Sequence, residues 1–166
     1  MKDHEVPHLH KGLATRGEME HSLDRYLQPT FKTHPILYLA FHGYPASKGQ
    51  QSGLWLGEDD LLPLGELADL MAGRCGNRII YFGACSAMAT DGRRLNSFLH
   101  KTEAKAVCGY KEEVDWVEST AFDLLFLGKI QSVTLRRRDS LERFDEKLRE
   151  TAPRLYHDLG FRMVVR

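Results

Sequence analysis

The sequence predicts an α/β fold: a three-layer sandwich in which a mostly parallel sheet carries helices on both faces. Three short apolar runs, at 36–41, 79–82 and 105–110, have the length and composition of buried strands, and a helical pattern follows each of them along the chain. Strands that alternate with helices in this way are parallel and joined by right-handed crossovers. With 166 residues, the chain is expected to form a single domain over 1–166.

An amphipathic helix is predicted before the first strand, over about 16–28. Thr15 and Glu18 have the spacing of a capping box, and apolar residues follow at helical intervals from Met19 onward. Residues 1–14 show no such periodicity, so this segment is expected to be irregular.

Three histidines lie close together in that first segment, at His4, His8 and His10. Histidines four residues apart can share a metal ion when they lie on a helix, but Pro7 argues against a helix there. A solvated terminus is therefore the preferred interpretation. No Gly-rich nucleotide-binding motif occurs in the chain. We expect neither a metal ion nor any other cofactor.

The first strand, at 36–41, ends in His42-Gly43. A polar stretch follows, and residues 54–57, Leu-Trp-Leu-Gly, are typical of a small strand or the edge of a hairpin. Apolar residues then recur at helical spacing and predict a helix over about 64–71.

The second strand, at 79–82, runs through two small residues to Cys85. Asp91 is placed to cap the helix that follows, and the third strand is expected at 105–110. Cys108 lies inside this third strand and is expected to be a core residue.

Three elements are predicted after the third strand. A helix over about 119–127 is apolar on most sides and is expected to be buried. A charged helix around 141–148 is expected on the surface, and residues 161–165 have the composition of a last strand.

Composition excludes several classes of partner. Lys and Arg number 23, as do Asp and Glu, so net charge gives no reason to expect nucleic acid or an anionic membrane. No apolar run approaches the roughly 20 residues of a membrane span, and the first residues lack the apolar core of a signal peptide. The three cysteines show no CxxC spacing, which favours free thiols in a reducing compartment. We expect a cytoplasmic protein.

His42 and Cys85 lie just past the ends of two predicted strands. Ligands of parallel sheets bind at the carboxyl ends of strands, and neighbouring strands lie about 4.8 Å apart. If these two strands are neighbours, the imidazole and the thiol can meet in one crevice. The imidazole could then take the thiol proton and return it to a leaving amine, while the N–H groups of Gly43 and Cys85 hold an oxyanion.

The two strand ends resemble those of the caspase-like (clan CD) cysteine peptidases, which include caspases, metacaspases, gingipains and the bacterial CHAT domains. Phe-His-Gly stands at 41–43 and Gly-Ala-Cys-Ser at 83–86, and the resemblance covers about 36–128. His42 precedes Cys85 by 43 residues, close to the roughly 50 of caspases. The CHAT-like bacterial members are the most similar.

This resemblance implies a cysteine endopeptidase that acts on a peptide or protein substrate. Cys85 would be the nucleophile, His42 the general acid and base, and Gly43 part of the oxyanion site. The caspase signature Gln-Ala-Cys-Arg-Gly is absent, so aspartate specificity is not expected. No long segment separates Cys85 from the third strand, which gives no support to activation by linker cleavage. An activating protein partner or a homodimer stays open.

In such folds the segment after the third strand lines the pocket for the residue before the cleaved bond. This places Tyr110, Asp115 and Trp116 as candidate substrate-binding residues, with Asp115 able to pair with a substrate Arg or Lys. The alternative is that Glu112, Glu113 and Asp115 form an ordinary solvated turn.

Other nucleophile motifs are missing. The Cys-x5-Arg loop of protein phosphatases and the Gly-x-Ser-x-Gly elbow of α/β-hydrolases do not occur. A second hypothesis comes from a different class of protein: a caspase-like domain that serves as a catalytically inactive binding or scaffold module.

Overall fold

A four-stranded sheet forms the centre of the computed structural model, which describes residues 7–48, 51–57 and 60–166. The sheet has the order β1-β5-β6-β7, with strands β1 (Ile36–Ala40), β5 (Ile79–Gly83), β6 (Ala106–Tyr110) and β7 (Phe161–Val165). β1, β5 and β6 are parallel, and β7 runs antiparallel to β6. The predicted mostly parallel sheet is confirmed, as are all three of its parallel strands and the last strand.

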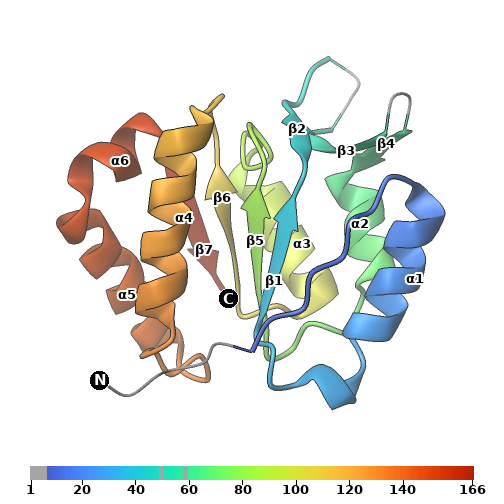
Figure 1. The fold of residues 1–166 in the computed structure, drawn as a ribbon, viewed down its shortest axis with the longest axis horizontal. Coiled ribbons are helices and arrows are strands. Elements are labelled where there is room, and N and C mark those ends of the chain that lie inside the picture. The colour runs from blue at the N-terminus through green and yellow to red at the C-terminus, as the bar shows by residue number, and fades with distance from the viewer. Residues whose placement is uncertain (1–6, 49–50, 58–59) are drawn as a thin grey trace.

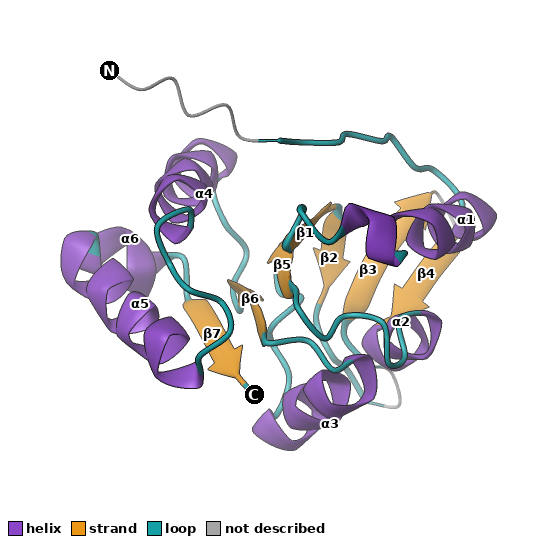
Figure 2. Ribbon diagram, turned by 90° about the horizontal axis from the view of Figure 1, so that it is seen from below, coloured by secondary structure: helices purple, strands orange, loops and turns teal. Residues whose placement is uncertain are grey.

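Helices cover both faces of this sheet (Figures 1 and 2). One layer holds α1 (Arg16–Tyr26), α2 (Leu64–Leu70) and α3 (Gly92–Thr102), and the other holds α4 (Trp116–Ile130), α5 (Arg138–Thr151) and α6 (Pro153–Asp158). A short 3-10 helix, Pro29–Phe31, precedes β1. The α/β sandwich expected from the sequence is therefore present.

Each helical layer has its own hydrophobic core. Successive residues of a strand point to opposite faces of a sheet, so β5 contributes to both cores. Ile80 and Phe82 pack with the α1–α3 layer, whereas Ile79 and Tyr81 pack with the α4–α6 layer. This explains why the run at 79–82 is apolar throughout instead of alternating.

A second, smaller sheet follows directly from the first strand. Its strands, in the order β2-β3-β4, are β2 (His42–Tyr44), β3 (Gly53–Gly57) and β4 (Asp60–Pro63), and neighbours in it are antiparallel. The strand expected at 54–57 is confirmed, whereas β2 and β4 were not predicted. Only Phe41 separates β1 from β2, so the chain passes from one sheet to the other at His42.

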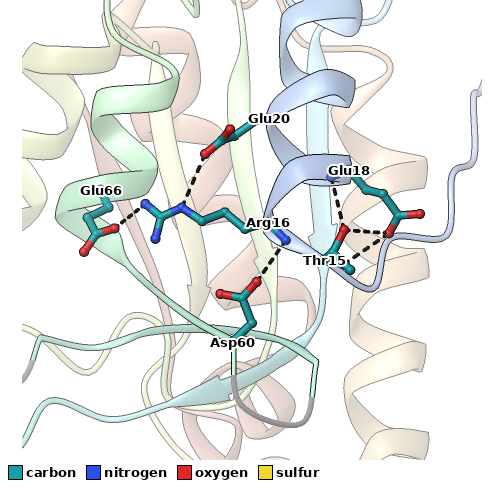
Figure 3. A network of polar contacts seen from close by, with 6 residues as sticks. All are labelled: Thr15, Arg16, Glu18, Glu20, Asp60 and Glu66. Carbon is teal, nitrogen blue, oxygen red and sulfur yellow. Dashed lines mark hydrogen bonds and ion pairs between the residues drawn. The ribbon is translucent and has the colours of Figure 1, made fainter.

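Helix α1 is fixed to the small sheet and to α2 by polar contacts (Figure 3). The predicted capping box is present, with the Thr15 and Glu18 side chains each accepting from the backbone of the other. The Arg16 backbone N–H donates to Asp60 at 2.9 Å, and the Arg16 guanidinium contacts Glu66 of α2. These contacts hold β4 and α2 against the start of α1.

Helix α4 departs from its prediction in length and in burial. It begins at Trp116 because the Asp115 carboxylate accepts hydrogen bonds from the N–H groups of Val117 and Glu118. The expectation that this helix is buried was wrong for its outer side, where Val117 is 55% and Leu124 66% exposed. Its inner side does pack in the core.

One buried carboxylate joins α4 to three strands. Asp123 accepts hydrogen bonds from the hydroxyls of Tyr38 (2.5 Å), Tyr81 and Tyr110, which come from β1, β5 and β6. Burial, and next the hydrogen bond to Asp123, raise the pKa of Tyr38 and of Tyr110, so these phenols stay protonated donors. We call these four residues the tyrosine–aspartate cluster.

We expect Asp123→Asn to lower the free energy of unfolding by about 1.5–3 kcal/mol, because an amide cannot replace a charged acceptor for three donors. Urea denaturation followed by circular dichroism measures this change. Asp139→Asn, which removes an exposed carboxylate of α5, is the control and should change stability by less than about 1 kcal/mol. Equal stability of the two variants would contradict the assigned role of the cluster.

Candidate active site

The register of the central sheet brings the two predicted strand ends together. β1 and β5 are parallel neighbours, and the last pair in their register is Ala40 with Gly83. Two residues further along each chain stand His42 and Cys85. The condition set by the sequence, that the two strands be adjacent, is therefore met.

The backbones of Gly43 and Cys85 touch directly past these strand ends. A Cβ atom placed on Gly43 would lie 1.8 Å from the carbonyl oxygen of Cys85 and 3.3 Å from its amide nitrogen. No side chain fits in this space, so glycine is required here to let the two segments meet. The contact holds the His42-Gly43 segment against the residue that carries the thiol.

Cys85 differs from the other two cysteines of the chain. Cys75 and Cys108 are fully buried, whereas Cys85 is partly exposed. Burial raises the pKa of the Cys75 thiol to about 11 and that of Cys108 well above its ordinary value. The expectation that Cys108 belongs to the core is confirmed, and Cys85 is the thiol that a solvent-borne reagent or substrate can reach.

The side chain of His42 is exposed and lies at the start of the small sheet, where it pairs in register with Trp55. Trp55 is itself 46% exposed. Within the described part of the chain, no hydrogen bond is made by the His42 ring, so no carboxylate orients it there. The same absence covers Cys85, so the thiol and the imidazole follow adjacent strand ends without a hydrogen bond between them.

The turn that follows Cys85 is sharp and firmly held. Ser86 has a φ of 55°, which is uncommon for a residue other than glycine. Its N–H donates to the carbonyl of Glu112 at 3.0 Å, and the N–H of Met88 donates to that of Tyr110 at 2.9 Å. The loop after the thiol is therefore fastened to the segment between β6 and α4, and no sequence signal marked this turn.

The amide of Cys85 has the properties expected of an oxyanion donor. Its N–H donates to no group among residues 7–48, 51–57 and 60–166. The Gly43 backbone lies against the same residue. A backbone N–H without a partner can stabilise a negatively charged oxygen formed beside the sulfur.

A pocket of about 910 Å³ opens beside the Ser86 turn. It is bounded by Pro45, Ala46 and Ser47 after β2, by the Ser86 turn, and by the segment after β6. Its charged lining residues are Asp91, Arg94, Lys111, Glu112, Glu113 and Arg162. Its volume is that of a ligand pocket. Neither His42 nor Cys85 lines it, although Ser86, the residue after Cys85, does.

The three predicted substrate-binding residues have other surroundings. Tyr110 is 1% exposed and donates to Asp123, so its assignment to a substrate pocket was wrong: as a strand residue it points into the α4–α6 core. The carboxylate of Asp115 caps α4. Trp116 is 76% exposed on the first turn of α4. Instead, Glu112 and Glu113 of the same segment line the pocket.

Of the three histidines near the start, His8 and His10 lie among the described residues. His4 lies outside the described residues, and the segment from 7 to 14 is irregular, as expected. Among the residues that the structure describes, no group of three or more His, Cys, Asp or Glu side chains could hold a metal ion, and no helix could cross a membrane.

Native-state alkylation should separate the three thiols. We expect iodoacetamide to label Cys85, while Cys75 and Cys108 stay unmodified because both are buried and Cys75, with its pKa of about 11, remains protonated at neutral pH. Peptide mapping by mass spectrometry identifies the labelled residues, and labelling in urea should modify all three. Labelling of Cys75 or Cys108 at the rate of Cys85 would contradict this exposure pattern.

Gly43→Ala should disturb the site locally. The added methyl group overlaps the Cys85 carbonyl, so we expect a loss of about 1–3 kcal/mol in the free energy of unfolding and a changed alkylation rate at Cys85. Gly12→Ala is the matched control, because a Cβ atom on Gly12 meets nothing within 4 Å. If the Gly43→Ala and Gly12→Ala proteins unfold at the same urea concentration, the contact between Gly43 and the Cys85 backbone does not contribute to stability.

Comparison with known proteins gives a family but no activity. No curated protein matches this sequence. A family model described as "Family of unknown function (DUF6642)" matches residues 1–165, which is nearly the whole chain. The chain therefore belongs to the DUF6642 family.

Proposed function

We propose that the protein is a cysteine endopeptidase that uses a Cys85/His42 dyad. The observation that carries this proposal is the meeting of Gly43 with the backbone of Cys85 at the carboxyl ends of two parallel strands, which puts the residue that carries the partly exposed thiol against the residue that follows His42. Support also comes from the adjoining pocket, and from the sequence resemblance to caspase-like and CHAT-like peptidases.

The proposed reaction has two stages. The His42 imidazole takes the proton of Cys85, and the thiolate attacks the peptide carbonyl carbon while the Cys85 and Gly43 N–H groups hold the oxyanion. Collapse breaks the C–N bond, and His42 gives the proton to the leaving amine, which leaves a thioester. Water then attacks this thioester with His42 as base, releasing a carboxylic acid and the free thiol.

We also propose that the substrate carries a basic residue before the cleaved bond. Asp115 is engaged as a helix cap, so this preference is assigned to Glu112 and Glu113, which line the pocket and are exposed. No ion pair engages either carboxylate within the described residues. Both are therefore free to face a substrate guanidinium or ammonium group. A cytoplasmic location is part of the proposal, since free thiols suit a reducing compartment.

A binding or scaffold domain is the second candidate. The specific observation in its favour is that no described side chain orients the His42 ring, as a catalytic imidazole usually requires. Such a domain would keep the fold and the exposed thiol but show no enhanced reactivity toward peptide-like electrophiles.

Active-site labelling distinguishes the two candidates. We expect a peptidyl acyloxymethyl ketone with Arg next to the warhead to modify the wild-type protein and not Cys85→Ala. His42→Ala should slow labelling by about 100-fold or more, because general acid and base catalysis contributes at least that much. His100→Ala, which removes an exposed histidine of α3, is the matched control and should label like the wild type.

The same assay, read by intact-mass spectrometry, tests the preference for a basic residue. A probe with Asp in place of Arg should label the wild type more slowly. The double variant Glu112→Gln/Glu113→Gln should reduce this difference in labelling rate between the two probes. The control Glu146→Gln on α5 should leave the difference unchanged. If no probe labels a folded wild-type protein whose Cys85 reacts with iodoacetamide, the peptidase proposal fails and the scaffold is favoured.

A further inference from the structure

The outer face of α4 is exposed and carries no charge. Along it lie Val117, Ala121, Leu124, Gly128 and Gln131, at alternating spacings of four and three residues, and all five are exposed. This is the spacing of a seam between two packed helices. Figures 1 and 2 show α4 in one layer with α5 and α6, and the exposure of these five residues shows that the described part of the chain leaves this face uncovered.

Two polar side chains at this face, Thr120 and Gln131, each donate one hydrogen bond to a carbonyl of α4. The Thr120 hydroxyl donates to the Trp116 carbonyl at 2.6 Å, and the Gln131 amide donates to the Leu127 carbonyl at 2.9 Å. A donor that already has a partner within its own helix costs less free energy to remove from water than one without a partner.

We infer that this face binds the same face of a second copy of the chain, with the two α4 helices antiparallel. In that pairing, Val117 lies opposite Gly128 of the other copy, and Leu124 lies opposite Ala121. Each large side chain thus meets a small one, and no atom of its own chain occupies the space outside Gly128 within 4 Å of a Cβ position. The two-fold axis makes both contacts occur twice.

The charges beside the face fit the same pairing. At about 100° per residue, Glu118 and Lys129 fall on one flank of α4, at opposite ends of the seam. A two-fold axis normal to the plane of two antiparallel helices keeps this flank on the same side in both copies. Glu118 of each copy then lies near Lys129 of the other. Neither residue has an ion pair within the described chain.

The opposite flank is apolar. Trp116, which is 76% exposed, falls on that side together with Leu127. The antiparallel arrangement brings Trp116 of each copy near Leu127 of the other. In this pairing, large side chains lie opposite small ones, acidic residues lie near basic ones, and apolar flanks lie side by side. The surface is therefore complementary to itself. This argues for a second copy over an unrelated protein. A helix of 15 residues supplies a small interface, so we expect a dissociation constant on the order of 10 to 100 µM.

Sedimentation velocity over a concentration series tests the dimer. We expect the wild type to shift from monomer to dimer in the micromolar range, and Leu124→Glu to raise the dissociation constant by at least about tenfold. Gly128→Leu should do the same by filling the space opposite Val117. Both positions are open to solvent, so these variants should fold, which circular dichroism verifies.

Charge exchange identifies the antiparallel arrangement. Glu118→Lys alone and Lys129→Glu alone should each weaken the dimer, because every cross-pair becomes like-charged. The double variant should restore it, and so should a 1:1 mixture of the two single variants, in which all the cross-pairs are opposite in charge. Glu146→Lys on α5 is the control and should behave like the wild type.

A wild type that stays monomeric throughout the series overturns the inference, even if it binds some other protein. A dimer that is insensitive to Leu124→Glu and to the charge exchange overturns it as well. Peptidase labelling at Cys85 is not part of this test, so either proposal can fail without the other.

Discussion

The close approach of Gly43 to Cys85 is the constraint on which the candidate site depends. Strand pairing alone aligns β1 with β5 as far as Ala40 and Gly83, after which the chains diverge into a second sheet and a sharp turn. The missing side chain at Gly43 lets them stay in contact beyond the sheet. This contact keeps the His42-Gly43 segment against the backbone of Cys85.

The small sheet determines where His42 lies. β2 is only three residues long, and its position is set by pairing with β3, which pairs in turn with β4. β4 is held to α1 through Asp60. The location of His42 is thus determined through the hairpin and the first helix, which are far from Cys85 in the sequence.

The sequence predicted the central sheet well because hydrophobic patterning is a local signal. Runs such as 79–82 can be buried on both faces only in a covered sheet, and Thr15 and Asp91 are caps with known spacing. The position of His42 and Cys85 just past two adjacent strand ends could be predicted from the parallel topology alone. In contrast, β2 and the turn at Ser86 depend on contacts between distant segments, which no local pattern encodes.

The candidate substrate-binding residues were harder to predict, because their roles also depend on contacts that no local pattern encodes. Tyr110 stands at the end of a strand, where one residue of shift changes the face to which a side chain points. Its hydroxyl donates to a buried carboxylate, and no local pattern indicates that Asp123, in the middle of an apolar helix, points inward. Asp115 likewise serves its own helix, which leaves Glu112 and Glu113 at the pocket.

The inward Asp123 also fixes how α4 is turned about its own axis. Three phenols from three strands reach one carboxylate, so neither a rotation nor a slide of the helix by one turn keeps all of these bonds. The hydrogen bonds to Asp123 in the core therefore determine that Val117 and Leu124 point outward. A substitution in the core at Asp123 would alter the outer surface without changing any residue that lies on it.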